Sequence, residues 1–137
     1  MIVQQRPMNV FDIAGRAMSA QLVRLNTTAS NLANAGSVSA TREGAFRALK
    51  PVFQTVGGEP GVATVDVSRV VQSDIEPVKR HSPGHPLADA NGDVWEAGVD
   101  TSAELIDMVE SARQYQNNVQ VLQTAKTLTL DTLRLGQ

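Results

Sequence analysis

The stretch Asn9–Ala35, NVFDIAGRAMSAQLVRLNTTASNLANA, decides how this chain begins to fold. Apolar residues recur in it every seven positions, with others beside them, which gives one narrow stripe along a helix. The stripe consists of Phe11, Ala14, Met18, Leu22, Leu25, Ala29 and Leu32. Asn9 is a suitable N-cap with Asp12 three residues later, and Gly36 is a stop signal. We therefore predict a helix from Asn9 to Ala35.

A second, longer pattern runs from Thr101 to Leu135. Thr101 and Glu104 match the capping box Ser/Thr-x-x-Glu, and Gly136 is the expected breaker. Apolar residues step by three and four from Leu105 to Leu122, and the pattern loosens at Lys126 and Thr129 before it ends in leucines. The whole segment predicts a helix roughly 50 Å long. Its stripe consists of Leu105, Met108, Ala112, Tyr115, Val119, Leu122 and Leu133. Two such helices, one at each end of a small chain, are typical of a pair that packs together.

The middle of the chain has a different composition, rich in Gly and Pro. Its β-branched pieces predict strands over Phe46–Val56 and Val62–Val71, with a short third piece at Val94–Ala97. We interpret residues 57–61 as a loop and Pro77–Gly92 as an irregular loop, because glycine and proline break regular structure. Asn91-Gly92 predicts a tight turn. Trp95 either anchors a small core or faces a neighbouring molecule.

The resulting fold class is mainly α with a small β-rich insertion, an α+β chain whose terminal helices pair as a coiled coil. We divide it into an N-terminal helix segment (1–36), an irregular β-rich middle (37–100) and a C-terminal helix segment (101–137) that packs against residues 9–35. The first helix is rich in Asn, Thr and Ser, which weaken an isolated helix. From the residues alone, an intramolecular helical hairpin and an assembly seam remain equal interpretations of the stripes.

Composition narrows the function classes. A chain of 137 residues corresponds to one domain. The formal net charge of −2 does not suggest binding to nucleic acid, and the lack of cysteine excludes disulfides and thiolate chemistry. Residues 1–8 lack the pattern of a cleaved signal peptide, and no apolar run is long enough for a membrane span.

Reactive constellations are absent from the sequence. His81 and His85 are four apart, a zinc-binding spacing on a helix, but Pro83 and Gly84 lie between them, which favours solvated loop residues. Residues 89–93 resemble a calcium loop only faintly, because the glycine is one place early. We expect no catalytic residue, metal, cofactor or small-molecule substrate.

Several stretches resemble the flagellar basal-body rod protein family, and more narrowly its proximal rod members. They are Phe11–Gln21 and Arg24–Asn34, Phe46–Ala48 with Pro51–Gln54, Pro83–Gly92, Val99-Asp100, Ser111–Leu122 and Thr132–Gln137. The resemblance implies an N/C coiled coil in the inner layer of a tube, with the β-rich middle outside it. It also implies passage through the flagellar type III export apparatus without a cleaved signal, then polymerisation in the periplasm into a rod that transmits motor torque.

The partners that the resemblance implies are copies of the chain itself and other flagellar rod proteins. Departures from the family pattern occur at Ala35-Gly36-Ser37 and in the short segment before Phe46. Residues 1–7 are interpreted as an extension, with Met1 and Met8 as alternative starts. These departures support one alternative to a rod subunit, a paralogue that acts as an adaptor or export-linked partner. A small enzyme or ligand-binding domain is the other alternative, and the lack of a reactive constellation argues against it.

Overall fold

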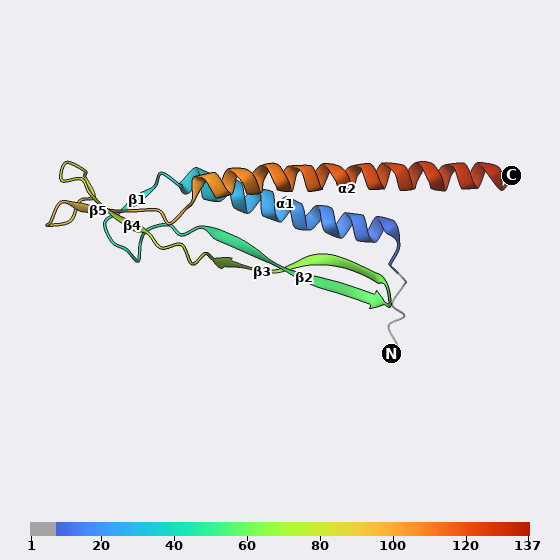
Figure 1. Ribbon diagram of the computed structural model, residues 1–137, viewed down its shortest axis with the longest axis horizontal. Coiled ribbons are helices and arrows are strands. Elements are labelled where there is room, and N and C mark those ends of the chain that lie inside the picture. Colours follow the sequence, from blue (N-terminus) through green and yellow to red (C-terminus); the bar gives the residue numbers. More distant parts are fainter. Residues whose placement is uncertain (1–7) are drawn as a thin grey trace.

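The computed structural model describes residues 8–137, so the predictions about residues 1–7 and the start of the chain lie outside the described residues. Within this range, the chain begins with one helix, continues through five strands and ends with a second helix (Figure 1). The elements are α1 (Val10–Asn34), β1 (Val38–Ser39), β2 (Leu49–Glu59), β3 (Val62–Gln72), β4 (Val78–His81), β5 (Asp93–Glu96) and α2 (Thr101–Leu135). The α+β class is confirmed.

The start of α1 follows the predicted capping box. The Asn9 side-chain oxygen accepts a hydrogen bond from the Asp12 N–H (2.9 Å), and the Asp12 carboxylate accepts one from the Asn9 N–H (3.2 Å). Two backbone donors that the first turn leaves unpaired are thereby satisfied. Local sequence was sufficient to place this end of the helix.

The helix α2 spans the predicted residues, Thr101–Leu135, but its cap differs from the prediction. The N-cap is Asp100, whose carboxylate accepts a hydrogen bond from the Ala103 N–H at 3.1 Å. Thr101 is already the first helical residue, so the predicted Thr101–Glu104 capping box is wrong. Glu104 does not turn back to the helix start, because its side chain is buried against two other elements.

Three layers form the body of the molecule. The helix α1 lies between α2, which runs antiparallel to it, and the β2–β3 hairpin (Figure 1). The residues that α1 buries are small or polar: Ala14, Ala20, Thr28 and Asn31. Small side chains let a helix approach neighbours closely on two sides. The hairpin is tied to α1 by the Thr64 hydroxyl, which donates to the Ile13 carbonyl at 3.0 Å.

The strand β2 is shifted toward the turn relative to the prediction: it spans Leu49–Glu59 and not Phe46–Val56, whereas β3 ends one residue later than predicted, at Gln72. Antiparallel pairing runs from Leu49↔Gln72 to Glu59↔Val62, so the strand continues through the glycines that we assigned to a loop. Gly57 pairs with Ala63, because backbone pairing needs no side chain. The chain reverses only at Pro60-Gly61, where Gly61 has φ 83°, a value that glycine adopts without strain.

A three-stranded sheet of order β1-β5-β4 forms the end of the molecule remote from the hairpin turn (Figure 1). The prediction of an irregular loop over Pro77–Gly92 is wrong for its first part. Residues 78–81 form β4, antiparallel to β5, and His81 is therefore a strand residue. The strand is set by pairing with a distant segment, which local composition does not reveal. A tight turn is present one residue earlier than predicted: the Gly92 N–H donates to the Asp89 carbonyl at 2.9 Å, and Gly92 follows the turn at φ 77°.

The two helices differ in length, with 25 residues in α1 and 35 in α2. The last turns of α2 therefore extend past the start of α1 (Figure 1), and Leu133 and Leu135 in this overhang are exposed. Neither helix in residues 8–137 combines the length and apolar character that crossing a membrane requires.

Candidate assembly interface

The structure divides the predicted assembly residues into two groups. One group is shielded by the fold of the chain itself, as expected where α1 and α2 pack together. It consists of Ala14, Met18, Leu25, Leu32, Met108, Ala112, Tyr115, Val119 and Leu122. The other group is exposed and consists of Phe11, Leu22, Ala29, Leu105 and Leu133. The stripes thus contain both an inner face and residues that the single chain leaves open.

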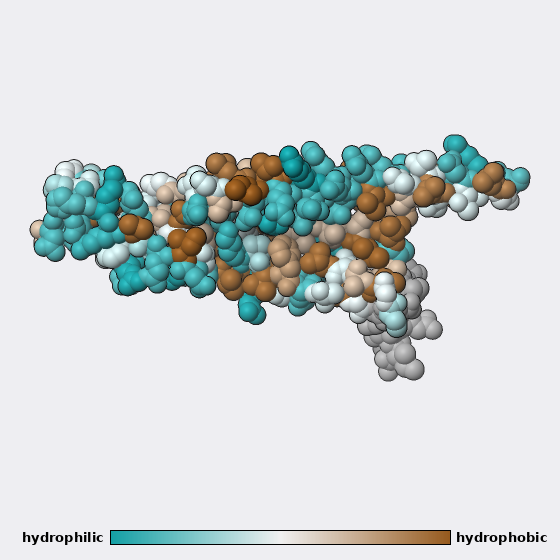
Figure 2. Space-filling view, viewed as in Figure 1, coloured by the Kyte–Doolittle hydropathy of each residue, from teal (hydrophilic) through white to brown (hydrophobic). Residues whose placement is uncertain are grey.

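An apolar patch covers the first turns of α2. Leu105, Ile106 and Val109 are 52%, 68% and 53% exposed, and Glu110 and Arg113 border them. Figure 2 shows apolar surface gathered over this part of the helix. We call these three apolar residues the outer patch. Sequence reasoning found only Leu105, although Val109 lies one helical turn further on the same side.

A second apolar surface lies where α2 passes the start of α1. Val10, Val121 and Leu128 line a groove of about 680 Å³, together with the polar Asn117, Gln120, Thr124 and Thr129. Val10 and Leu128 are 43% and 62% exposed. The outer patch and this groove therefore lie toward opposite ends of the paired helices, and a single chain covers neither.

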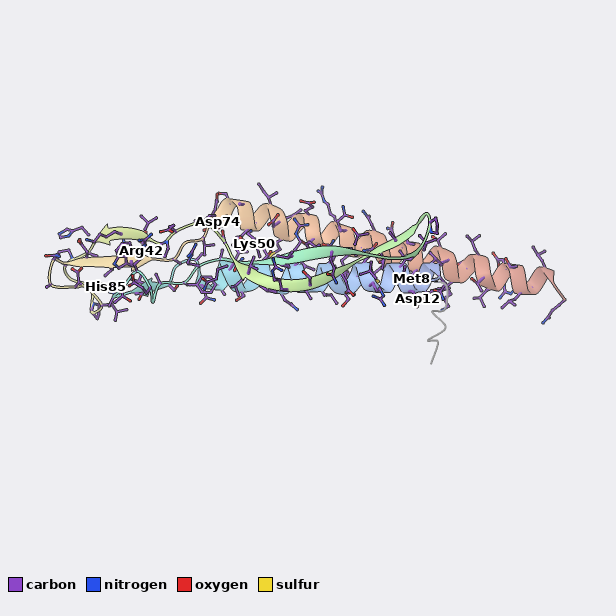
Figure 3. All side chains as sticks on the ribbon, turned by 90° about the horizontal axis from the view of Figure 1, so that it is seen from below. Met8, Asp12, Arg42, Lys50, Asp74 and His85 are labelled. Atoms are coloured by element: carbon purple, nitrogen blue, oxygen red, sulfur yellow. The ribbon has the colours of Figure 1, made fainter. Side chains whose placement is uncertain are left out.

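A polar junction joins α1, β2 and α2 beneath the outer patch; we define it as Asn31, Leu49, Lys50 and Glu104. The Glu104 side chain is 2% exposed, and its two oxygens accept from the Lys50 ammonium at 2.6 Å and the Asn31 amide at 3.0 Å. Asn31 is fully buried. Figure 3 labels Lys50 where β2 passes beside the start of α2.

The ion pairs continue outward from the polar junction. Asp107 lies 3.3 Å from the Lys50 ammonium and 2.8 Å from the Arg24 guanidinium. Burial alone raises the pKa of Asp107, but hydrogen bonds from Arg24 and Lys50 outweigh this effect and hold the pKa below its usual value. Burial alone lowers the pKa of Lys50, whereas the hydrogen bond to Glu104 and its charge bring the pKa above the usual value.

Sequence reasoning missed the polar junction entirely. Asn, Lys and Glu on helices and strands ordinarily face solvent, and these residues lie up to 73 positions apart in the chain. No local pattern distinguishes Glu104 from a solvated helix residue. The one available signal was that Glu104 directly precedes Leu105 and lies one helical turn before Met108, and both belong to the predicted stripe.

The charges at the tip of the three-stranded sheet are also paired. Asp93 lies 2.9 Å from the His81 Nδ1 and 3.0 Å from the Lys79 ammonium. Hydrogen bonds with these two partners lower the pKa of Asp93, and the one with His81 has the larger effect. The Lys79 ammonium lies 6.0 Å from the centroid of the half-buried Trp95 ring.

The two histidines do not form a shared site. Instead of turning toward His81, the Nδ1 of His85 accepts a hydrogen bond from the Leu87 N–H at 3.1 Å. Residues 8–137 contain no cluster of three or more His, Asp or Glu that could hold a metal ion.

Comparison with known proteins matches both helical ends of the chain. Residues 11–38 match the family described as "Flagella basal body rod protein", and residues 90–135 match "Flagellar basal body rod FlgEFG protein C-terminal". The flagellar basal-body rod protein FlgC of Salmonella typhimurium is 47% identical over 132 residues, which covers 95% of this chain and 98% of that protein. The chain belongs to the FlgC family of flagellar basal-body rod proteins.

Other FlgC proteins extend this similarity. FlgC of Yersinia enterocolitica is 46% identical over 132 residues, with the same coverage of both chains. FlgC of Buchnera aphidicola subsp. Schizaphis graminum is 37% identical over 141 residues, again covering 95% of this chain and 98% of the relative. The two family matches coincide with α1 and β1 at one end and with β5 and α2 at the other. The helices that carry the predicted assembly residues are thus the segments that mark the family.

Proposed function

We propose that this chain is a structural subunit of the bacterial flagellar basal-body rod, which assembles through its terminal helices and transmits motor torque to the hook. The observation that carries the proposal is the match to FlgC proteins over 95% of the chain. Two exposed apolar surfaces on the helices support it, because patches of this kind mark surfaces that other proteins cover.

The terminal helices act as an N/C coiled coil in this proposal. Met18 and Leu25 of α1 and Met108 and Tyr115 of α2 are partly shielded, as expected for an inner seam. The exposed members of the predicted interface, Phe11 among them, are then available to neighbouring subunits. In this proposal the α1–α2 pair buries some of the predicted interface residues within the chain, and neighbouring subunits bury the others.

The partners in this proposal are copies of the chain and other flagellar rod proteins, and the flagellar type III export apparatus delivers it to the periplasm-spanning rod without a cleaved signal peptide. The role is structural, with no enzymatic reaction, nucleic acid or small-molecule substrate. Support for these points comes from the family, whose relatives are named as rod proteins.

The test is mass spectrometry of intact basal bodies purified from the source cells, alongside a strain that lacks the chain. We expect the chain in the rod fraction and no rod in the deletion strain. Complementation with Leu25→Asp is expected to leave expression unchanged but to abolish motility, because a carboxylate cannot be accommodated at a half-buried helix contact. Normal flagella without the chain would instead identify an adaptor paralogue.

A further inference from the structure

The side chain of Asn31 takes the place of a third strand beside the hairpin. Its Oδ1 accepts from the Leu49 N–H and its Nδ2 donates to the Leu49 carbonyl, both at 2.8 Å. Leu49 is the first residue of β2, and its other side faces Gln72 of β3. A helix side chain therefore satisfies the outer backbone edge of a strand, where an unpaired donor and acceptor would otherwise remain.

This contact fits only one alignment of β2 on α1. Alternate residues face the same edge of a strand, so a slip of two residues is the smallest that keeps each side chain on its own face. In one direction the slip brings Pro51 beside Asn31, and proline has no N–H to donate. In the other direction it brings Arg47, which precedes the start of the strand.

The same amide also links α2 to this alignment. The Nδ2 that donates to Leu49 also donates to Glu104 of α2, and Glu104 accepts in turn from Lys50 of β2. Each of the three elements thus contacts the other two at one buried point. A buried ion pair adds little net stability over apolar residues of similar size, whereas a buried polar group that needs its partner can specify register.

We propose that Asn31, with Lys50 and Glu104, is the residue set that fixes the register of the hairpin and of α2 on α1. Asn31 sets the position of β2, and Glu104 transfers that position to α2. The outer patch on α2 is consequently held at one offset from the hairpin. This inference concerns the single chain and does not depend on the rod function.

Distance measurements on the purified chain test the proposal. The sequence has no cysteine, so spin labels can be placed on cysteines introduced at the exposed Ala33, Thr55 and Gln116. The wild-type background should give one narrow distance for Ala33–Thr55 and one for Ala33–Gln116. With Asn31→Ala we expect a second Ala33–Thr55 population displaced by up to about 7 Å, two residues at 3.3 Å each.

The variant Lys50→Met/Glu104→Met separates the two links. It should remain folded, leave Ala33–Thr55 narrow and add an Ala33–Gln116 population displaced by about 5 Å, one helical turn. Should Asn31→Ala fail to fold, this double variant decides the question. Ser111→Ala is the matched control, because Ser111 is also fully buried but its hydroxyl bonds only within α2, to the Asp107 carbonyl.

Unchanged narrow distances in a folded Asn31→Ala, or in the double variant, would overturn the proposal and reduce the polar junction to an ordinary stabilising contact. The same holds if Ser111→Ala broadens the distances as much as Asn31→Ala does.

Discussion

The backbone of Gly98 passes so close to Ile75 that a Cβ on Gly98 would lie 2.5 Å from the Ile75 carbonyl oxygen. The backbones of Glu76 and Pro77 would lie within 3.1 Å of the same atom. Gly98 also donates to the Phe46 carbonyl at 2.8 Å and accepts from the Ala48 N–H at 3.1 Å. Three segments, residues 46–48, residues 75–77 and Gly98, thus meet here, between the β2–β3 hairpin and the three-stranded sheet.

Gly98→Ala should destabilise the protein by about 1–3 kcal/mol, because the atoms that a methyl group would meet belong to the backbone and cannot rotate away. Urea unfolding measures the change. Gly15→Ala is the control: Gly15 lies in α1 with nothing within 4 Å of a Cβ, so the substitution should stabilise by about 0.5–1 kcal/mol. Equal effects of the two variants would contradict this close contact.

Asp100→Ala should destabilise the start of α2 by about 1 kcal/mol, because the Ala103 N–H loses its capping acceptor. Thr101→Ala should have a much smaller effect, since Thr101 is exposed and does not cap the helix. Thermal melting followed by circular dichroism compares the two variants. The opposite order of stability would restore Thr101 as the cap.

Asp107→Asn should be less stable than the wild type at neutral pH, and the difference should disappear on acidification. The pKa of Asp107 is lower in the folded chain than its ordinary value of 3.8, so its ion pairs contribute fully above that value and are lost as the pH falls through the folded pKa. Urea unfolding from pH 7 down to pH 2 gives the two stability curves. A constant difference across this range would show that the Asp107 charge does not matter.

Ile106→Asp should leave the isolated chain folded but prevent its incorporation into the rod. Ile106 is 68% exposed, so the charge is solvated in the monomer and becomes unfavourable only where another subunit covers the outer patch. Circular dichroism tests the fold, and basal-body fractionation with swimming assays tests assembly. Gln116→Asp adds the same charge at an exposed polar position of α2 and should remain motile. Motile Ile106→Asp cells would remove the outer patch from the interface.

Local signals in the sequence were sufficient for the helices. The Asn9–Asp12 capping box and the apolar stripe lie within the segment they describe, so α1 was predicted to within one residue at each end. The strand β4 was missed because only its pairing with β5 distinguishes residues 78–81 from the loop that follows. The hairpin turn was placed too broadly, because Gly57 weakens a strand without ending it when Ala63 pairs opposite.

Much of the candidate site depends on long-range contacts. The exposure of Ile106 and Val109 follows from helical periodicity once the buried face of α2 is known. The polar junction could not be predicted, because a buried Glu104 has the same local sequence pattern as a solvated one, and its partners lie 54 and 73 positions away. Which of the predicted stripe residues contact other subunits remains a prediction.

The unequal lengths of α1 and α2 have a mechanical consequence. With 25 and 35 residues, the two helices cannot be level at both ends, and α2 is longer by roughly 15 Å at 1.5 Å per residue. In the proposed rod, this free length of α2 is available to overlap the helices of a neighbouring subunit. A torque along that rod would then act as shear between the sides of overlapping helices.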